Sequence, residues 1–552
     1  MLSMSPRDIH PLAIRDAVSD AAAAWLKNRL PKAAGLCADT RRLQSGDAFL
    51  ARSGQKVAAQ DNIAKAVIAG AAAVLLDAHA DEGLPVEVKG QVPTLAVPHL
   101  AKRMGMIASA FYDRPSMALQ LFAVTGTNGK SSVTTSLAYA MARSGICSAA
   151  IGTLGMAIFP AHCAKDFSPQ WNTEITGGLT TPDAVDLQRV LSALKAQGVR
   201  VVTIEASSVG LLQGRLQGCM IKTAVFTNLS HDHLDLHGSM QAYAKAKALL
   251  FESQTLGAVV INTDDAYGMT MWDAVMVHAD RIAVGSTLPK NAYAGFAAIN
   301  AQAELNGWTI QIEGRGKAAA VSGTVHLPVV GRHNIDNALT VAACLFLQDF
   351  DPAEIHARLS EFHLPAGRLQ MIHEPQSPWV CIDYAHSPDA LMRALEGLRL
   401  VAEQRAGRLI CIFGCGGDRD TAKRPLMGEI ATRLSDQVVL TSDNPRTESP
   451  EAILRDIARG IPAALATKVT QIVDREAAIK QTVMQARPED LILVAGKGHE
   501  SLQHLADRTI PFSDADQART AIHQWLESHD PTVPPTSAVQ SDPAFVSGVH
   551  RA

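Results

Sequence analysis

The stretch LFAVTGTNGKSS, residues 121–132, decides the fold that the sequence predicts. Its first five residues indicate a short buried strand, and helix-periodic sequence follows from Lys130. The glycine-rich turn between them can point backbone N–H groups at phosphate oxygens, at the positive end of the helix dipole. Strand, glycine-rich loop and helix in this order favour ATP binding.

Two side chains of this turn suit particular parts of a nucleotide. Lys130 can reach the β- and γ-phosphates, and the Ser131 hydroxyl can hold Mg²⁺. The turn is shorter than the full form GxxxxGK[ST], so an ordinary Gly-Asn turn stays an alternative when the motif is taken alone. The predicted ATP-binding residues here are Gly126, Thr127, Asn128, Gly129, Lys130, Ser131 and Ser132.

Outward from this stretch, the same rhythm repeats. Apolar strands are expected at residues 199–205, 221–228 and 257–262, each followed by polar residues and then by a helical pattern. This repetition predicts a parallel, doubly wound sheet. The less regular residues 307–328 suggest an antiparallel extension, and helix-periodic sequence resumes from residue 331.

Two further α/β blocks flank this one. The first hundred residues indicate a small α/β domain, with a helix at 63–72 leading into a strand at 72–78. From Trp379 onward, five apolar strands separated by helical stretches have the rhythm of a Rossmann-like sheet: WVCIDYA, RLICIFG, QVVLTSD, TQIVD and LILVAG.

We therefore predict the α/β class with three domains. They are a small N-terminal α/β domain (1–114), a central P-loop ATPase-like doubly wound domain (115–364) and a C-terminal Rossmann-like domain (365–527). Residues 528–552 are rich in Pro and Ser and are expected to form a disordered tail.

Composition excludes several classes of protein. Hydrophobic residues make up 47% of the 552 positions, which argues against intrinsic disorder for most of the chain. The formal net charge of −4 argues against a general polyanion binder, because nucleic-acid affinity needs a surplus of clustered Lys and Arg. We expect no nucleic-acid partner.

The cysteines and apolar runs bear on location. The eight cysteines form no CxxC pair, which favours buried reduced thiols over disulfides or a zinc site. The longest apolar run, residues 66–76, is well short of the ~20 residues that span a bilayer. The N-terminal sequence lacks the features of an export signal. We expect a cytoplasmic protein without a membrane association.

Acidic and histidine side chains follow two strands of the central block. Glu205 ends one strand, and HDHLDLHG (residues 231–238) follows another. Both fall at the carboxyl edge of the predicted sheet, so Glu205 and His233 could hold a nucleotide-bound magnesium. A solvated loop with helix-capping acids explains the cluster equally well. On composition alone, Lys245 and Lys247 are surface charges.

The C-terminal block presents polar loops at three strand ends. They are GCGGDRD (414–420), DNPR (443–446) and GKGHE (496–500). Each alone is an ordinary turn. Together they bring two Arg, one Asn and one Glu to one crevice, and this set suits a small zwitterion with carboxylate and ammonium groups.

The ordered set of motifs, over residues 37–525, resembles the Mur ligase family of ATP-dependent amide-forming enzymes. The motifs are ADTRRLQSGDAFLA, GTNGKSS, LTTPDAVDLQ, EASS, TNLSHDHLDLHG, VINTDD, GRHNIDNAL, AGRLQ, IDYAHSPDAL, FGCGGDRDTAKRPLMG, SDNPRTE, VDREAAI and AGKGHE. Within the family the chain looks most like the ligases that add meso-2,6-diaminopimelate to UDP-N-acetylmuramoyl-L-alanyl-D-glutamate.

The resemblance implies a reaction and its cofactors. ATP and Mg²⁺ would convert the D-glutamate carboxylate to an acyl phosphate, which the diaminopimelate amine then attacks. It also implies that the N-terminal domain binds the UDP end and the C-terminal domain the amino acid. We expect a monomer.

Residue roles are implied by position in the family motifs. UDP and the muramoyl-dipeptide would contact Thr40, Arg41, Thr180, Thr181, Ser207, Ser208 and Arg215. The nucleotide would also meet Asn334, Asn337, Arg368, Asp383 and His386. Diaminopimelate would meet Arg419, Asp443, Asn444, Arg446, Gly496 and Glu500. The catalytic set would be Lys130, Glu205, His233 and Lys247, with metal ligands Ser131, Glu205, His233 and Lys247, the last as a carbamate (N6-carboxylysine).

Some positions depart from the family pattern. Val209 replaces a usual His, Gln370 a usual Glu, His333 a frequent aromatic residue and Ser501 a usual polar residue after GHE. The change at Val209 bears on a contact near the dipeptide and on the role of Arg215.

Three other functions stay open. A folylpolyglutamate synthase shares the ATPase chemistry but is expected to lack DNPR with GKGHE. A lysine-adding ligase of the same family is not expected to have the DNPR arginine. A nucleotide-binding module without ligase chemistry is the alternative from another class.

Overall fold

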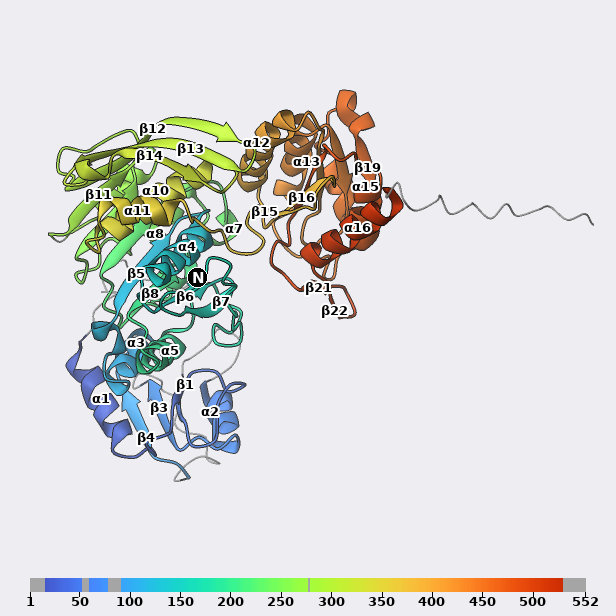
Figure 1. Ribbon diagram of the computed structural model, residues 1–552. Helices are drawn as coiled ribbons and strands as arrows, with labels where there is room; N and C mark the ends of the chain where they lie inside the picture. Colours follow the sequence, from blue (N-terminus) through green and yellow to red (C-terminus); the bar gives the residue numbers. More distant parts are fainter. Residues whose placement is uncertain (1–14, 52–58, 78–90, 277, 530–552) are drawn as a thin grey trace, which may run out of the picture.

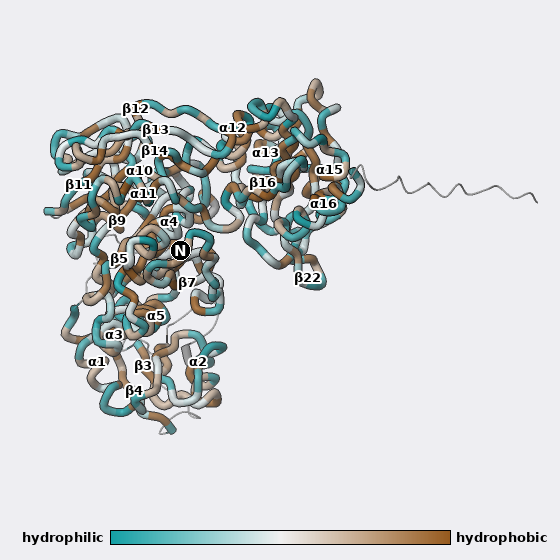
Figure 2. The backbone as a smooth tube through the Cα atoms, viewed as in Figure 1, coloured by the Kyte–Doolittle hydropathy of each residue, from teal (hydrophilic) through white to brown (hydrophobic). Residues whose placement is uncertain are grey.

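The computed structural model describes residues 15–51, 59–77, 91–276 and 278–529, which form three lobes in chain order (Figure 1). Apolar sequence lies along the strands inside each lobe, with hydrophilic stretches on the outside (Figure 2). The architecture confirms the predicted α/β class. The predicted C-terminal tail lies outside the described residues, apart from residues 528 and 529, which belong to a helix.

The N-terminal lobe holds a four-stranded parallel sheet in the order β1-β2-β3-β4. Its elements are α1 (Ala17–Lys27), β1 (Leu36–Cys37), β2 (Ala48–Ala51), α2 (Ala59–Ile68), β3 (Ala73–Asp77), β4 (Thr94–Val97) and α3 (Leu100–Phe111). The predicted helix and strand around residue 70 correspond to α2 and β3. Arg42 joins this lobe to the central one by an ion pair with Asp186.

The central lobe is built on a ten-stranded sheet in the order β14-β13-β12-β11-β10-β9-β5-β8-β6-β7. Its strands are β5 (Gln120–Thr125), β6 (Ser148–Gly152), β7 (Gly155–Phe159), β8 (Val201–Glu205), β9 (Thr223–Phe226), β10 (Ala258–Asn262), β11 (Asp280–Val284), β12 (Ala294–Glu304), β13 (Gly307–Gly316) and β14 (Gly323–Leu327). The strands from β12 through β6 are parallel, and β13, β14 and β7 are antiparallel additions at the two edges. The predicted parallel strands and antiparallel extension are therefore present.

Helices cover both faces of this sheet, as doubly wound topology requires. One apolar core joins the sheet to α4 and α10, and a second joins it to α5, α8 and α9. The helices are α4 (Lys130–Arg143), α5 (Ala184–Ala196), α6 (Ser208–Leu212), α7 (Leu234–His237), α8 (Met240–Ala248), α9 (Gly268–Asp273), α10 (His333–Phe346) and α11 (Pro352–Leu359). Gly129, at φ 84°, makes the left-handed turn that starts α4.

The C-terminal lobe has a six-stranded sheet in the order β15-β16-β20-β17-β18-β19, in which only β15 is antiparallel. Its strands are β15 (Gln370–Ile372), β16 (Trp379–Asp383), β17 (Leu409–Phe413), β18 (Gln437–Leu440), β19 (Val469–Gln471) and β20 (Leu491–Ala495), followed by the hairpin β21 (Leu502–His504) and β22 (Thr509–Pro511). One face is covered by α12 (Pro388–Gln404), α13 (Lys423–Leu434) and α14 (Pro450–Ala458), the other by α15 (Arg475–Met484) and α16 (Asp514–His529).

The structure bears on the expectations for the cysteines and for membrane-spanning segments. All eight cysteines are unpaired, and seven of them are buried. In the described part of the chain, no helix combines the length and apolar character needed to cross a membrane.

A buried ion pair fastens the last helix to the C-terminal sheet. Arg475 Nε and Nη2 donate to the two carboxylate oxygens of Asp514 at 2.7 Å each, and both side chains are fully buried. The guanidinium also donates to the backbone carbonyls of Ser442 and Ala495, at the ends of two strands. The pair therefore holds two strand ends and α16 together.

Replacing Asp514 by Ala should lower the free energy of unfolding by about 3–5 kcal/mol, because the Arg475 charge would stay buried without its partner. Urea denaturation followed by tryptophan fluorescence measures the change. The matched control is Asp516→Ala, which removes an exposed ion pair to Arg519 on the same helix. Equal destabilisation by the two variants would contradict the expectation.

Candidate active site

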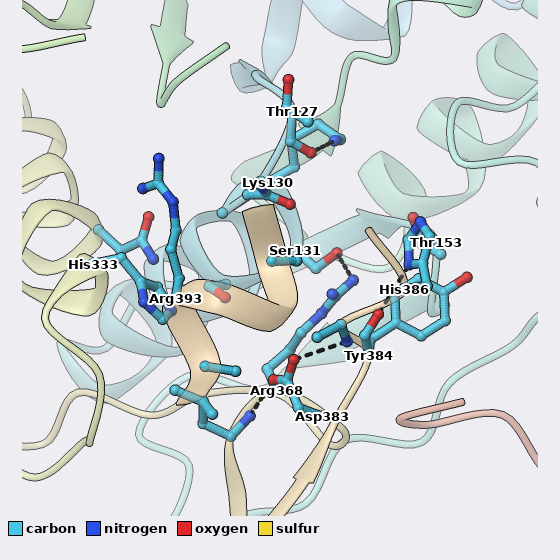
Figure 3. A pocket seen from close by; sticks show the side chains of 18 of the residues that line it. Thr127, Lys130, Ser131, Thr153, His333, Arg368, Asp383, Tyr384, His386 and Arg393 are labelled. Atoms are coloured by element: carbon cyan, nitrogen blue, oxygen red, sulfur yellow. Dashed lines mark hydrogen bonds between the residues drawn. The ribbon is translucent and has the colours of Figure 1, made fainter. Parts of the chain in front are cut away.

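A cavity of about 230 Å³ lies where the phosphate loop of the central lobe meets the C-terminal lobe (Figure 3). The loop residues Thr127 to Ser132 form one wall. Strand β8 contributes Glu205, and the segment entering the C-terminal sheet contributes Arg368. The strand–loop–helix unit thus opens onto the cavity, as its position at the carboxyl edge of a parallel sheet predicts.

Lys130 lies folded over its own loop. Its Nζ donates to the carbonyls of Gly126 at 2.9 Å and Thr127 at 2.8 Å. Burial lowers the pKa of Lys130, whereas the carboxylates of Glu205 and Asp232 oppose that shift. The ammonium is therefore held at the floor of the cavity by two carbonyl oxygens.

Lys247 lies beneath the same loop and outside the cavity lining. Its Nζ donates to the Gly126 carbonyl at 2.7 Å and stands 4.6 Å from the centre of the Tyr243 ring. The side chain is 1% exposed, and burial, together with the nearby Lys130, holds its pKa well below the ordinary value. Lys247 is thus a buried amine, and its composition-based interpretation as a surface charge is wrong. Lys245, by contrast, is exposed on the same helix.

Glu205 is fixed by hydroxyl and amide donors. Its Oε1 accepts from Ser131 Oγ at 2.8 Å and from the Thr153 amide at 3.0 Å, and its Oε2 accepts from Thr153 Oγ1 at 3.2 Å. Arg368 Nη2 donates to Ser131 Oγ at 3.2 Å. His233, at φ 53°, lines the same cavity.

The oxygen donors here suit magnesium. Within the described ranges, no three His, Cys, Asp or Glu side chains gather as a metal-binding group. Mg²⁺ in nucleotide sites usually takes one or two protein oxygens and completes its shell with phosphates and water. The adjacent Ser131 hydroxyl and Glu205 carboxylate match that requirement.

The five other residues with an implied nucleotide role also line the cavity. They are Asn334, Asn337, Arg368, Asp383 and His386. Burial raises the pKa of Asp383 although Arg368 opposes it, and its two oxygens accept from the amides of Leu369 and Ala385. Asp383 therefore shapes the backbone at the entrance to the C-terminal sheet.

The residues with an implied dipeptide or UDP role divide into three groups. Thr180 and Ser207 line the cavity, and Thr181, Ser208 and Arg215 belong to the same lobe but not to the lining. Arg215 Nη1 donates to the Thr181 carbonyl at 2.7 Å. The structure does not bring Thr40 and Arg41 to this cavity: they lie in the N-terminal lobe, where Arg41 pairs with Asp39.

The residues with an implied amino-acid role meet at one edge of the C-terminal sheet. A Cβ placed on Gly416 would lie 2.9 Å from Arg446 Nη1 and 3.8 Å from Arg419 Cγ, so both arginines pass this glycine. Arg446 has φ 52°, a conformation uncommon outside glycine.

The same edge holds the remaining members of this set. Asn444 Nδ2 donates to Glu500 Oε2 at 2.8 Å. A Cβ on Gly496, at φ 116°, would collide with Asp443 Oδ2, so this position requires glycine. The residues with an implied amino-acid role therefore lie close together, as their positions at three strand ends predicted.

Family comparisons agree with this architecture. The family described as Mur ligase middle domain matches residues 124–345, and the Mur ligase, glutamate ligase domain matches residues 367–498. The chain belongs to the Mur ligase family.

Individual Mur ligases extend the similarity over most of the chain. The UDP-N-acetylmuramoyl-L-alanyl-D-glutamate–2,6-diaminopimelate ligase of Ralstonia nicotianae is 40% identical over 508 residues, 90% of this chain and 95% of its own. The ligase of the same name from Chromobacterium violaceum is 42% identical over 495 residues, 88% and 94% of the two chains.

Solved structures show the same relationship. A ligase of that name has a TM-score of 0.60 and 32% identity, covering 89% of this chain and 94% of its own. The folylpolyglutamate synthase of Mycobacterium tuberculosis, solved with ADP, has a TM-score of 0.55 at 18% identity, covering 72% and 91% of the two chains. The latter likeness concerns the fold alone.

Sequence reasoning missed several residues of this Mur ligase cavity. Thr153, Asp232, Tyr384 and Arg393 also line it. Tyr384 stands in the quoted motif IDYAHSP, and its ring lies 4.6 Å from the Arg368 guanidinium. Arg393 belongs to none of the quoted motifs. It lies within α12 and reaches the cavity from that helix.

Two of the departures from the family pattern can be placed. Gln370 Oε1 accepts a hydrogen bond from the Gly367 amide at 3.0 Å. The glutamine thus provides an acceptor oxygen, as a glutamate at this position would. His333 lines the main cavity and a second one of about 170 Å³ beside it. Burial lowers the pKa of His333 to about 4, so this Mur ligase presents a neutral imidazole there.

Proposed function

We propose that the chain is an ATP-dependent ligase that joins meso-2,6-diaminopimelate to UDP-N-acetylmuramoyl-L-alanyl-D-glutamate, in the synthesis of peptidoglycan precursors. The observation that carries the proposal is the cavity in which the Lys130 loop and Glu205 meet Arg368, Asp383 and His386 of the C-terminal lobe. Relatives of this name, about 40% identical over 90% of the chain, support the substrate assignment.

The proposed chemistry has two steps. A carboxylate oxygen of the D-glutamate residue bonds to the γ-phosphorus while the bond to the bridging oxygen breaks, which releases ADP and leaves an acyl phosphate. The amine of diaminopimelate then attacks the acyl carbon, phosphate departs, and the amine loses a proton. Lys130 stabilises charge on the phosphoryl oxygens in the first step.

Magnesium fits the oxygen-rich side of the cavity. Ser131, Glu205 and His233 would hold it, and when bound it neutralises negative charge on the phosphates. The chain's own part is orientation: Thr153 and Ser131 fix both oxygens of Glu205, and Arg368 fixes Ser131.

The other substrate contacts are proposals of the same kind. UDP would lie against Thr40 and Arg41 in the N-terminal lobe, with the dipeptide running toward Thr180 and Ser207. The boundaries 1–114, 115–364 and 365–527 are proposed as the domain limits. The unpaired cysteines support a reducing, cytoplasmic setting.

ADP release tests the proposal. We expect release only when the UDP-muramoyl-dipeptide and diaminopimelate are both present with ATP. Binding of ATP without any substrate-dependent release would instead support a non-catalytic nucleotide-binding module. Release that requires a folate and glutamate would support a folylpolyglutamate synthase, although DNPR together with GKGHE argues against it.

Lys247 is proposed to be carbamylated in the working enzyme. Carbamylation needs a neutral amine, and burial beneath the phosphate loop favours that form by lowering the pKa of Lys247. The carbamate would place an oxygen-bearing anion beside Lys130. Native intact-mass analysis should show one added CO₂, which Lys247→Ala removes and Lys245→Ala keeps.

The Lys247→Ala variant should lose about 10- to 100-fold in activity, the range for groups that orient ligands around a metal. Lys245→Ala is the matched control, because Lys245 lies on the same helix and is exposed. Acid decarbamylation should lower activity, and bicarbonate should restore it. A fully active enzyme with an unmodified Lys247 would refute the proposal.

A further inference from the structure

Lys497 lies among the residues proposed to bind the amino acid and contacts two of them, Asn444 and Glu500. Its side chain is fully buried. Gly496 at φ 116° and Gly498 at φ 54° flank it, and these two left-handed residues turn the loop so that the lysine points inward. A buried ammonium is costly unless every donor is used.

All three donors of this ammonium are used. Lys497 Nζ donates to Asn444 Oδ1 at 3.0 Å, to Glu500 Oε2 at 3.0 Å and to the Leu502 carbonyl at 2.7 Å. Two of the three acceptors are side chains proposed to touch the incoming amino acid. The third ties the loop to the hairpin β21–β22.

The contacts fix the orientation of the Asn444 amide. Its carbonyl oxygen accepts from Lys497 and from the His504 amide, at 3.0 Å each. Its NH₂ group must therefore point the other way, and Nδ2 donates to Glu500 at 2.8 Å. A flipped amide would place NH₂ against the Lys497 ammonium, so the lysine excludes that arrangement.

The contacts also give the two oxygens of the Glu500 carboxylate different surroundings. Oε2 accepts from both Lys497 and Asn444, and no hydrogen bond from the described residues reaches Oε1. The side chain is 31% exposed. Glu500 thus keeps one oxygen toward solvent. A carboxylate oxygen without a protein donor can accept a hydrogen bond from a substrate ammonium.

We propose that Lys497 is the positioning residue of the amino-acid site: it fixes Asn444 and holds Glu500 so that its free oxygen receives an ammonium group of the incoming amino acid. The inference deepens the proposed function and rests on it. Lys497 acts through its neighbours, so its removal should weaken amino-acid binding and leave the nucleotide steps in place.

Arg475 is a useful contrast in the same lobe. It is also buried, but its partners are Asp514 and two backbone carbonyls, none of which is proposed to touch the amino acid. A role limited to stability would give Lys497 partners of that type.

Lys497→Met tests the inference, because Met has a similar length and no donors. The KM for diaminopimelate should rise about 10- to 100-fold, as expected for losing charged hydrogen bonds. The KM values for ATP and the UDP-muramoyl-dipeptide should stay within about twofold. Lys497→Arg keeps the charge and should recover part of the loss.

Two further variants separate positioning from folding. Lys468→Met is the matched control, since this lysine donates to the backbone carbonyls of Thr432 and Ser435 in the same lobe, and neither residue is proposed to touch the amino acid; its KM values should match the wild type. In a Glu500→Gln background, Lys497→Met should raise the KM for diaminopimelate by a smaller factor than in the wild type, because part of its effect passes through Glu500.

The outcomes are distinguishable. An unchanged KM for diaminopimelate in an active Lys497→Met enzyme would overturn the inference alone, as would equal rises in all three KM values. Full additivity with Glu500→Gln would also overturn it. If the unsubstituted protein releases no ADP with diaminopimelate, the proposed function fails and the inference fails with it.

Discussion

With diaminopimelate as the added amino acid, kcat/KM is expected to exceed the value for lysine by about 10⁴-fold. Diaminopimelate carries a distal carboxylate that lysine lacks. Arg446 Nη1 and the stem of Arg419 both lie close to Gly416, and an arginine fork can pair with such a carboxylate in bidentate fashion. With lysine bound, polar groups of the site would be left without a partner, and such a mismatch is what a hydrogen-bonding site rejects most strongly.

Steady-state assays with both amino acids measure this ratio, and an Arg446 variant locates its cause. In Arg446→Ala the preference should fall, because diaminopimelate loses its partner and lysine loses little. Arg459→Ala, an exposed arginine paired with Asp456 in the same lobe, should keep the wild-type ratio. Equal kcat/KM for the two amino acids in the wild type would show that the arginines do not read the carboxylate and would favour the lysine-adding alternative.

Replacing Lys130 by Ala should lower kcat by about 10²- to 10³-fold, because a charge that stabilises the phosphoryl group in the transition state would be lost. The structure places this charge at the phosphate loop, where Nζ donates to two carbonyls of the loop itself. Burial of the site strengthens the interaction with phosphate oxygens.

Turnover at saturating ATP measures the loss from Lys130→Ala. Lys195→Ala is the control, since this lysine is exposed on α5 of the same lobe and far from the loop in sequence. Near-normal turnover of Lys130→Ala would contradict the assigned role, because phosphoryl transfer could then not depend on that ammonium.

Local pattern was enough to predict the strands that lead to the site. β5, β8, β9 and β10 are short apolar runs followed by polar turns, and that signal needs no tertiary information. β12 (Ala294–Glu304) was not predicted, because its Ala-rich sequence has a low strand propensity and only its first residues are buried. Its pairing with β13 stabilises it, and pairing is a tertiary property.

The residues of the site likewise divide into those whose position local sequence predicts and those whose position depends on tertiary packing. Lys130 follows one strand and Glu205 ends another strand of the same sheet, so topology alone brings them together. Arg393 reaches the cavity only because α12 packs against the phosphate loop, where Asn128 Nδ2 donates to Asp389 at 3.0 Å across 261 positions of the chain. No local pattern encodes such a contact. The depth of Lys247 was misjudged from composition for the same reason.

The Gly126 carbonyl, shared by two lysines, has a consequence for anion selectivity. A ligand that recruits Lys130 must first break its bonds to Gly126 and Thr127, each worth about 1 kcal/mol net. A lone sulfate or phosphate ion brings few other contacts, so we expect it to offset that loss poorly. A nucleoside triphosphate can also contact the other residues that line the cavity, so we expect it to offset the loss better. The loop thus competes with its own ligands, and this competition should favour nucleotides over small anions.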